Sequence, residues 1–515
     1  MKAKINRLPY LTVLLLLCTS VGVLAQQPAI QYFRAYDKRG VNVYETPKED
    51  SVVYDGFKLR IGANFTQGYQ SMTNSNSSRA ILTGAGNLYE TGVGTGIFNT
   101  KLDGTGVNVP GLAPDPNVFG GYINTTNNSL YSNTNQVYQQ APGFPLAMAN
   151  LNLDVQLADG VRLNLVSYMS SHHHNEFWVK GGYLQVDKVK FLGSEMMNNL
   201  WKNLTLKVGH MEINYGDAHF RRSDGGNAMW NPFMEGNIMD SFTTEIGAEL
   251  YWHKSGFLAM MAMTDGEIQG NVSKPNDRKP SIYGKFGYDK NFGDRKRVRL
   301  TGSFYTTKSS ISNTIYGGDR TGSNYQYVME PTTATLTGNP FSGRFNPGFK
   351  DNVTSIMINP SAKIAGLEFF GTYEMTQGNS QVENGEVMYS NPTLFYNNTP
   401  GLTTISKLDN RKFTQIEADL VYRFGKGEKY YIGAKYNRVS GTAVFGQSTS
   451  AANINQGTRQ DISIDRTCFG GGWFITRNVL LKGEYVSQKY NDFPTDNILS
   501  GGKFNGFVIQ GTIGF

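Results

Sequence analysis

The chain has 515 residues, a formal net charge of +7 and a mean hydropathy of −0.38. Beyond the first 25 residues, no apolar run approaches the roughly 20 residues that a transmembrane helix needs, which argues against a helical membrane protein. The small positive surplus is spread over the whole length, so no nucleic-acid partner is expected.

The N-terminus has the order of features of a secretory signal peptide. Three basic residues between Lys2 and Arg7 precede an apolar run over 11–24 and a small residue, Ala25. This order predicts a signal peptide over 1–25 that is removed on export. Its loss lowers the number of Lys and Arg residues from 48 to 45 against 41 acidic residues, so the net charge falls from +7 to +4.

Apolar and polar residues alternate along much of the remaining chain, which indicates strands with one apolar and one polar face. A clear case is the hairpin predicted over 149–165, with Asp159-Gly160 as its turn. Charged residues recur at the polar positions, which suits a face in contact with water. The charged side chains expected on this lumen-facing side are Lys58, Arg60, Arg162, Lys207, Glu245, Glu249, Arg297, Arg299, Glu417 and Lys435.

About sixteen such segments can be counted, an even number as in bacterial single-chain barrels. Their connections alternate between short turns, such as 158–160 and 364–366, and longer loops, such as 214–242 and 308–353. The last segment alternates up to an aromatic residue, Phe515. The predicted strand centres lie near residues 62, 151, 165, 183, 208, 248, 260, 285, 302, 359, 372, 418, 434, 467, 483 and 510.

This pattern predicts an all-β fold, a transmembrane antiparallel β-barrel with short periplasmic turns and long extracellular loops. In a membrane every backbone polar group needs a partner within the protein, which a sheet achieves only by closing on itself. The expected domains are the signal peptide over 1–25, a periplasmic N-terminal segment or partial plug over 26–56, and the barrel over 57–515. The expected location is the outer membrane of a Gram-negative bacterium.

The loop between the fifth and sixth predicted strands is rich in charge and is expected to fold into the barrel. Its candidates for a constriction are Asp217, His219, Arg221, Arg222 and Asp224. The alternative is that the arginines and the nearby aspartates pair with each other and hold the loop in place.

Two motifs carry a family resemblance: GHMEINYGDAHFRRSDGGNAMWNPF at 209–233 and DKRGVNVYET at 37–46. With them, the chain resembles the porin-like outer-membrane proteins of Bacteroidetes, which are similar in turn to the phosphate-selective porin family. The resemblance implies a sixteen-stranded barrel, a homotrimer and a diffusive channel. It does not imply phosphate as the solute.

The function expected from these features is passive diffusion of small hydrophilic solutes or ions, with a slight anion preference. The alternative is a plugged or partner-binding barrel that acts as a scaffold or a secretion-associated component. No Ser-centred motif and no HExxH motif occurs, so no enzymatic activity, cofactor or metal is expected. The expected partners are outer-membrane lipids, lipopolysaccharide, further copies of the chain, and surface or periplasmic proteins.

Overall fold

Sixteen antiparallel strands form a closed barrel, which confirms the predicted fold class. The computed structural model describes residues 27–46, 48–84, 97–100, 112–114, 121–124, 129–169, 177–222, 224–267, 279–293, 295–308, 313–385, 406–450 and 453–515. The predicted signal peptide, over 1–25, lies outside these ranges.

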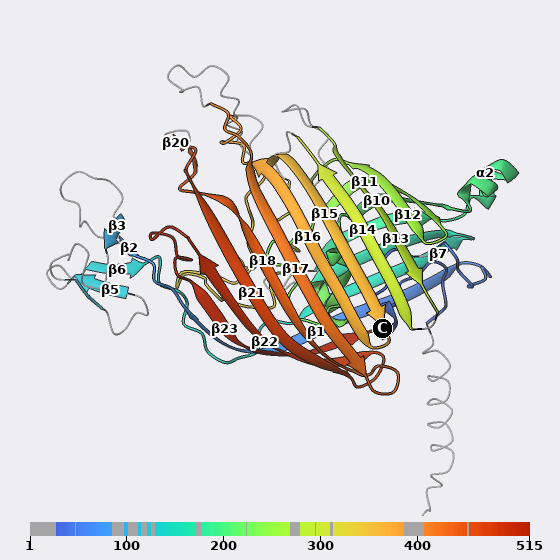
Figure 1. Ribbon diagram of the computed structural model, residues 1–515, viewed down its shortest axis with the longest axis horizontal. Coiled ribbons are helices and arrows are strands. Elements are labelled where there is room, and N and C mark those ends of the chain that lie inside the picture. The colour runs from blue at the N-terminus through green and yellow to red at the C-terminus, as the bar shows by residue number, and fades with distance from the viewer. Residues whose placement is uncertain are drawn as a thin grey trace, which may run out of the picture.

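Each predicted strand centre falls within a different strand of the barrel. Every strand pairs with the preceding and the following strand of the barrel, and β1 closes the ring by pairing with β23 (Figure 1). The strands are β1 (Lys58–Ser75), β7 (Met148–Ala158), β8 (Val161–Met169), β9 (Trp178–Val186), β10 (Leu204–Glu212), β11 (Thr244–Lys254), β12 (Phe257–Thr264), β13 (Ser281–Asn291), β14 (Lys296–Thr306), β15 (Asp351–Ile364), β16 (Leu367–Asn379), β17 (Arg411–Phe424), β18 (Tyr430–Phe445), β21 (Thr458–Phe474), β22 (Val479–Asn491) and β23 (Lys503–Gly514).

Short turns and long loops lie at opposite ends of the barrel. The turn between β7 and β8 is made by Asp159 and Gly160, whose φ of 74° is easy only for glycine. The short-turn end also carries the helix α2 (Glu195–Trp201), between β9 and β10, with Ser194 as its N-cap. Further 3₁₀ turns are η1 (Lys38–Gly40), η2 (Lys190–Leu192), η3 (Ala218–Arg221) and η4 (Asp224–Met229).

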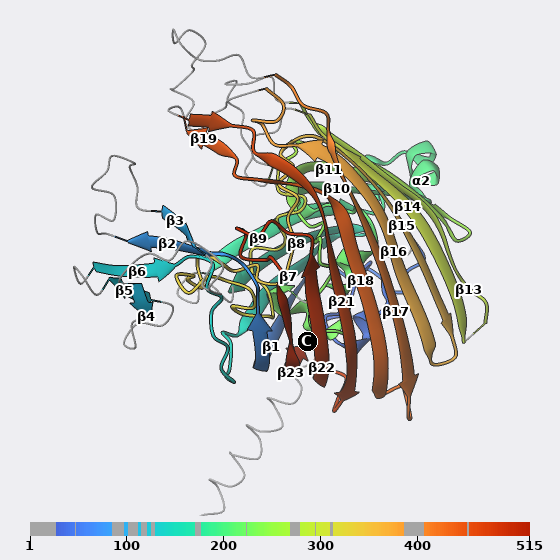
Figure 2. The same cartoon turned by 60° about the vertical axis from the view of Figure 1, so that its left-hand side comes forward.

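Two small sheets stand in the long connections, apart from the barrel wall (Figure 2). The first long connection contains a five-stranded sheet in the order β3-β2-β6-β5-β4, and the connection after β18 contains a two-stranded one. Their strands are β2 (Ala80–Gly84), β3 (Ile97–Thr100), β4 (Leu112–Pro114), β5 (Gly121–Asn124), β6 (Ser129–Asn133), β19 (Ser448–Ser450) and β20 (Asn453–Asn455).

The outer face of the barrel is apolar and the inner face is polar. Along β14, Val298, Leu300 and Phe304 are exposed while Arg299 and Thr301 are buried in the lumen. In a membrane, these exposed apolar side chains would contact the lipid hydrocarbon chains. Among the described residues, no helix is long and apolar enough to cross a membrane.

An aromatic row marks the short-turn end of this outer face. The rings of Tyr422, Phe424, Tyr430 and Trp473 stack one on the next, with centroid separations of 5.9, 5.6 and 6.2 Å. Amphipathic rings prefer the level of the lipid headgroups. The row therefore places one membrane boundary near the short turns.

Leu300→Arg is expected to destabilise the barrel by about 2–4 kcal/mol, because it places a cation near the middle of the hydrocarbon layer. Leu300 is exposed and lies near the centre of β14. The loss can be measured by urea unfolding in lipid vesicles.

Ile364→Arg is the matched control, because Ile364 is equally exposed but ends β15 at the short-turn end. An arginine at the interface costs about 0–1 kcal/mol. Equal losses for the two variants would contradict a lipid-facing outer wall.

Candidate functional site

The loop between β10 and β11, residues 213–243 and called L3 below, crosses the lumen. Its tip is held by polar side chains of the opposite wall. Lys482 of β22 donates to the carbonyl oxygen atoms of Asn231 and Phe233 at 3.0 and 2.7 Å. Glu484 accepts a hydrogen bond from the backbone N–H of Met234 at 2.8 Å. These contacts satisfy backbone groups of L3 that would otherwise be buried without partners.

Asp217 anchors the near end of L3 to the wall. Its carboxylate accepts from Arg299 at 2.7 and 2.8 Å, from Lys285 at 2.9 Å and from Thr301 at 2.8 Å. Burial would raise the pKa of Asp217, but Arg299 and Lys285 outweigh it and lower that pKa to about 2. Asp217 is therefore an ionised, fully paired anchor at neutral pH.

The two candidate arginines of L3 are also paired. Arg221 lies 3.3 Å from Asp419 of β17, and Arg222 binds Asp240 through two contacts of 2.5 and 2.9 Å. Asp419 belongs to the wall and Asp240 lies at the far end of L3. Both contacts are ion pairs between these arginines and aspartates, the kind of contact that the pairing alternative supposes.

His219 lies between two oxygen atoms. Its Nδ1 is 2.9 Å from Glu212 Oε1 and its Nε2 is 2.8 Å from Asn214 Oδ1. The side chain of Asp224, the fifth candidate, lies outside the described part of the structure.

The ten charged residues predicted to face the lumen lie at polar, inward positions of their strands. Lys58, Lys207 and Arg297 are half-buried. The other seven are buried, namely Arg60, Arg162, Glu245, Glu249, Arg299, Glu417 and Lys435. They are buried because the lumen is largely filled rather than open along its full width.

Residues 27–57, with Pro47 outside the description, form an N-terminal segment across the short-turn end. Lys38 donates to the carbonyl oxygen of Glu428 in the turn before β18 at 2.8 Å. Tyr36 donates to Asp154 of β7 at 2.7 Å, and Glu45 lies 2.7 Å from Arg299 of β14. The segment thus contacts strands on several sides of the mouth.

The loop between β14 and β15, residues 307–350 and called L5, also enters the lumen. Arg344 of L5 binds Glu235 and Asp240 of L3 at 2.9 and 3.1 Å. Tyr316 of L5 donates to Glu374 of β16 at 2.8 Å. L5 and L3 therefore form one polar, interlocked layer, and the sequence pattern gave no indication that L5 would do so.

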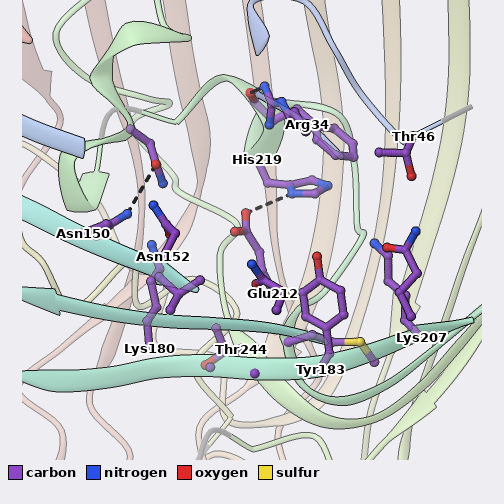
Figure 3. Close-up of a pocket in the computed structure, with 18 of the residues that line it drawn as sticks. Arg34, Thr46, Asn150, Asn152, Lys180, Tyr183, Lys207, Glu212, His219 and Thr244 are labelled. Atoms are coloured by element: carbon purple, nitrogen blue, oxygen red, sulfur yellow. Dashed lines mark hydrogen bonds and ion pairs between the residues drawn. The ribbon is translucent and has the colours of Figure 1, made fainter. Parts of the chain in front are cut away.

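A cavity of about 210 Å³ remains between L3, the N-terminal segment and the wall of β7–β11 (Figure 3). Five cationic side chains line it, namely Arg34, Arg162, Lys180, Lys207 and Arg222, together with the carboxylates of Glu45 and Glu212. Aromatic rings and amides complete the lining: Phe33, Tyr36, Tyr44, Tyr183, Phe220, Trp230, Asn150, Asn152, Asn164, Gln185 and Asn227.

Three of the five cations are neutralised by carboxylates behind the cavity wall. Arg162 pairs with Asp154 at 2.8 Å and Lys180 with Asp319 at 2.5 Å, while Arg222 pairs with Asp240. Glu45 is similarly paired, with Lys285 and Arg299. The charges left to act on the cavity are chiefly those of Arg34, Lys207 and Glu212.

Sequence reasoning missed Arg34, Lys180 and Glu212 as lining residues. Arg34 precedes the predicted barrel, and only the folded N-terminal segment brings it to L3, where its guanidinium lies 3.8 Å from the ring centroid of Trp230. Lys180 occupies a strand whose alternation is interrupted, since the register shifts between β8 and β9. Glu212 was within the resembling motif, and its charge beside His210 and Asp217 was the available signal.

The closed strand ring, the apolar exterior and the polar interior define an integral β-barrel of the outer-membrane class. Such a barrel is located in the outer membrane.

Comparisons with known proteins add no family assignment. No family model matches the chain, and no curated protein matches it. Solved structures with a similar barrel include OmpT, an outer membrane protein of Vibrio cholerae, at 10% identity and a TM-score of 0.41, covering 90% of this chain and 99% of that one. OmpT also matches in a trimer form.

Two further matches are outer-membrane channels. The channel DcaP of Acinetobacter baumannii has 9% identity and a TM-score of 0.42, covering 89% of this chain and 98% of that one. An anion-selective porin from Comamonas acidovorans has 10% identity and a TM-score of 0.43, covering 89% and 100%. Because these identities and TM-scores are low, the assignment of this protein to the outer-membrane barrel class rests on its own strand pairing and on its apolar exterior and polar interior.

Proposed function

We propose that the chain is an outer-membrane porin that lets small hydrophilic solutes diffuse passively, and that they pass through the cavity between L3 and the β7–β11 wall. The observation that carries this proposal is the polar lining of that cavity, which lies inside the barrel between L3, the N-terminal segment and the wall. A charged and amide-rich lining lowers the barrier that the lipid layer presents to polar solutes.

The same lining supports a slight anion preference. Arg34 and Lys207 are the cations without a close carboxylate partner, since the nearest carboxylate oxygen to Lys207, in Glu249, is 3.9 Å away. Among the described residues, no carboxylate lies within ion-pair distance of Arg34. Glu212 opposes these two charges, so the net field is positive but small.

Assembly as a homotrimer in contact with lipids and lipopolysaccharide belongs to the same proposal. It is supported by the resemblance of 209–233 to the porin-like proteins of Bacteroidetes, which are similar to the phosphate-selective family. Phosphate is not proposed as the solute, because Asp419 and Asp240 neutralise Arg221 and Arg222 of L3.

The test is single-channel recording of the purified protein in a planar bilayer under a salt gradient. We expect discrete open steps and a reversal potential displaced slightly towards that of the anion. Reproducible insertion without conductance would overturn the porin proposal and favour a plugged scaffold or a partner-binding barrel. A reversal potential on the cation side would overturn the anion preference alone.

A further inference from the structure

Glu212 differs from the other acidic groups around the cavity because it is accessible and its close partner is a histidine rather than a Lys or Arg. Its side chain is 31% exposed, whereas those of Glu45 and Asp154 are 4% and 0% exposed. Its one close polar contact is with His219. Among the described residues, no Lys or Arg lies within ion-pair distance of it.

Cations surround Glu212 without touching it. Arg34, Lys180, Lys207 and Arg222 line the same cavity as Glu212, and none of them lies within ion-pair distance of its carboxylate. In Figure 3, Glu212 lies between Lys180 on one side and Lys207 on the other, with His219 and Arg34 above it. Among the described lining residues, Glu212 is therefore the accessible carboxylate of a cavity that is also lined by five cationic side chains.

This arrangement discriminates solutes by charge. A simple anion is attracted by the cations and repelled by Glu212, and a simple cation experiences the reverse. A solute with both charges can place its ammonium group at Glu212 and its carboxylate towards Arg34 or Lys207. Each end then meets an opposite charge inside a partly desolvated cavity, where such contacts are stronger than in bulk water.

We propose that the cavity favours small zwitterionic solutes of the α-amino-acid type, with Glu212 as the group that receives the ammonium end. This inference rests on the proposed porin function and names its solute class. Arg34 and Lys207 are the cations with most freedom to receive the carboxylate. Arg34 donates to two backbone carbonyl groups but has no close carboxylate, and the Lys207 side chain is 23% exposed.

The experiment measures uptake into liposomes that contain the full-length protein. Four radiolabelled solutes of similar size serve as probes: glycine, glycolate, ethanolammonium and the neutral glycolamide. For the wild-type protein we expect glycine to enter faster than the other three. Failure of all four solutes to enter would overturn the porin function itself. Entry of glycolamide without any advantage for glycine would overturn only the present inference.

Glu212→Gln supplies the decisive comparison, because glutamine keeps the shape and can still accept the hydrogen bond from His219. Relative to glycolamide, glycine uptake is expected to fall about two- to fivefold, the size of a partly exposed ionic contact, while glycolate uptake rises. A parallel change of glycine and glycolate would contradict the assigned role of Glu212.

Two further variants distinguish the expected change in selectivity from a loss of folding. Lys207→Met is expected to lower the uptake of both glycine and glycolate relative to glycolamide, and to raise that of ethanolammonium. Glu195→Gln removes an exposed carboxylate on α2, outside the cavity, and should change none of the ratios. If Glu212→Gln abolishes the uptake of all four solutes, the Lys207→Met variant provides the test. Uptake ratios relative to glycolamide that are unchanged in Lys207→Met would then overturn the proposal.

Discussion

Asp217→Asn is expected to destabilise the folded barrel by about 3–5 kcal/mol, because it removes one partner from a buried set of charges. The remaining carboxylates near these two cations are those of Glu45, which already binds both Arg299 and Lys285, and Asp289, which binds Arg299 at 3.0 Å. Asn cannot supply the lost negative charge, so the buried Lys285 would keep only Glu45 as a carboxylate partner and would share it with Arg299. The loss can be measured by urea unfolding of the protein in lipid vesicles.

The same substitution should loosen L3, since Asp217 stands where the loop leaves the wall. Single-channel records of the variant are expected to show noisier open states than those of the wild type. Asp55→Asn is the control, because Asp55 forms an ion pair with Lys58 at 2.5 Å but is 66% exposed. Exposed pairs contribute about 0–1 kcal/mol. Equal stability of Asp217→Asn and the wild type would refute the anchoring role.

Deletion of residues 27–46 is expected to raise the single-channel conductance severalfold. This part of the N-terminal segment lies across the short-turn mouth, and its residues Phe33, Arg34, Tyr36, Tyr44 and Glu45 form one side of the cavity. Their removal also frees Trp230 of L3 from its contact with Arg34. The cross-section open to ions should therefore widen at this cavity.

The corresponding control restores the deleted segment as a separate peptide. A synthetic peptide of residues 27–46, supplied from the short-turn side, should lower the conductance of the deleted barrel and leave that of the wild type unchanged. If the deleted barrel conducts like the wild type, the segment is not a partial plug and the ions follow another route.

The strands could be predicted because their determinant is local. In β14, each residue from Arg297 to Phe304 faces lipid or lumen according to its place in a two-residue period, and the sequence displays that period directly. The turn at Asp159-Gly160 is equally local, since it depends on a glycine that adopts a positive φ.

The filling of the lumen could not be predicted in the same way. Arg221 forms an ion pair with Asp419, Arg344 forms one with Glu235, and Lys482 donates a hydrogen bond to L3. Each of these contacts joins segments that are distant in the sequence. A charged residue in a loop carries no local signal of which strand it will reach. The sequence thus indicated that L3 enters the barrel, but it did not indicate that its arginines would be neutralised or that Glu212 would remain accessible.

The junction of β1 and β23 has a consequence for how the protein folds. It pairs residues from opposite ends of the barrel sequence, such as Asn64 with Gly514. Contacts of such long sequence separation form slowly, because the entropy of a large loop must be lost before they are gained. The other strands can form sequential hairpins while this seam is still apart. The seam should therefore be the last part of the wall to acquire protection against amide hydrogen exchange during refolding, and the N-terminal segment, which contacts both sides of it through Tyr36, should become ordered at the same stage.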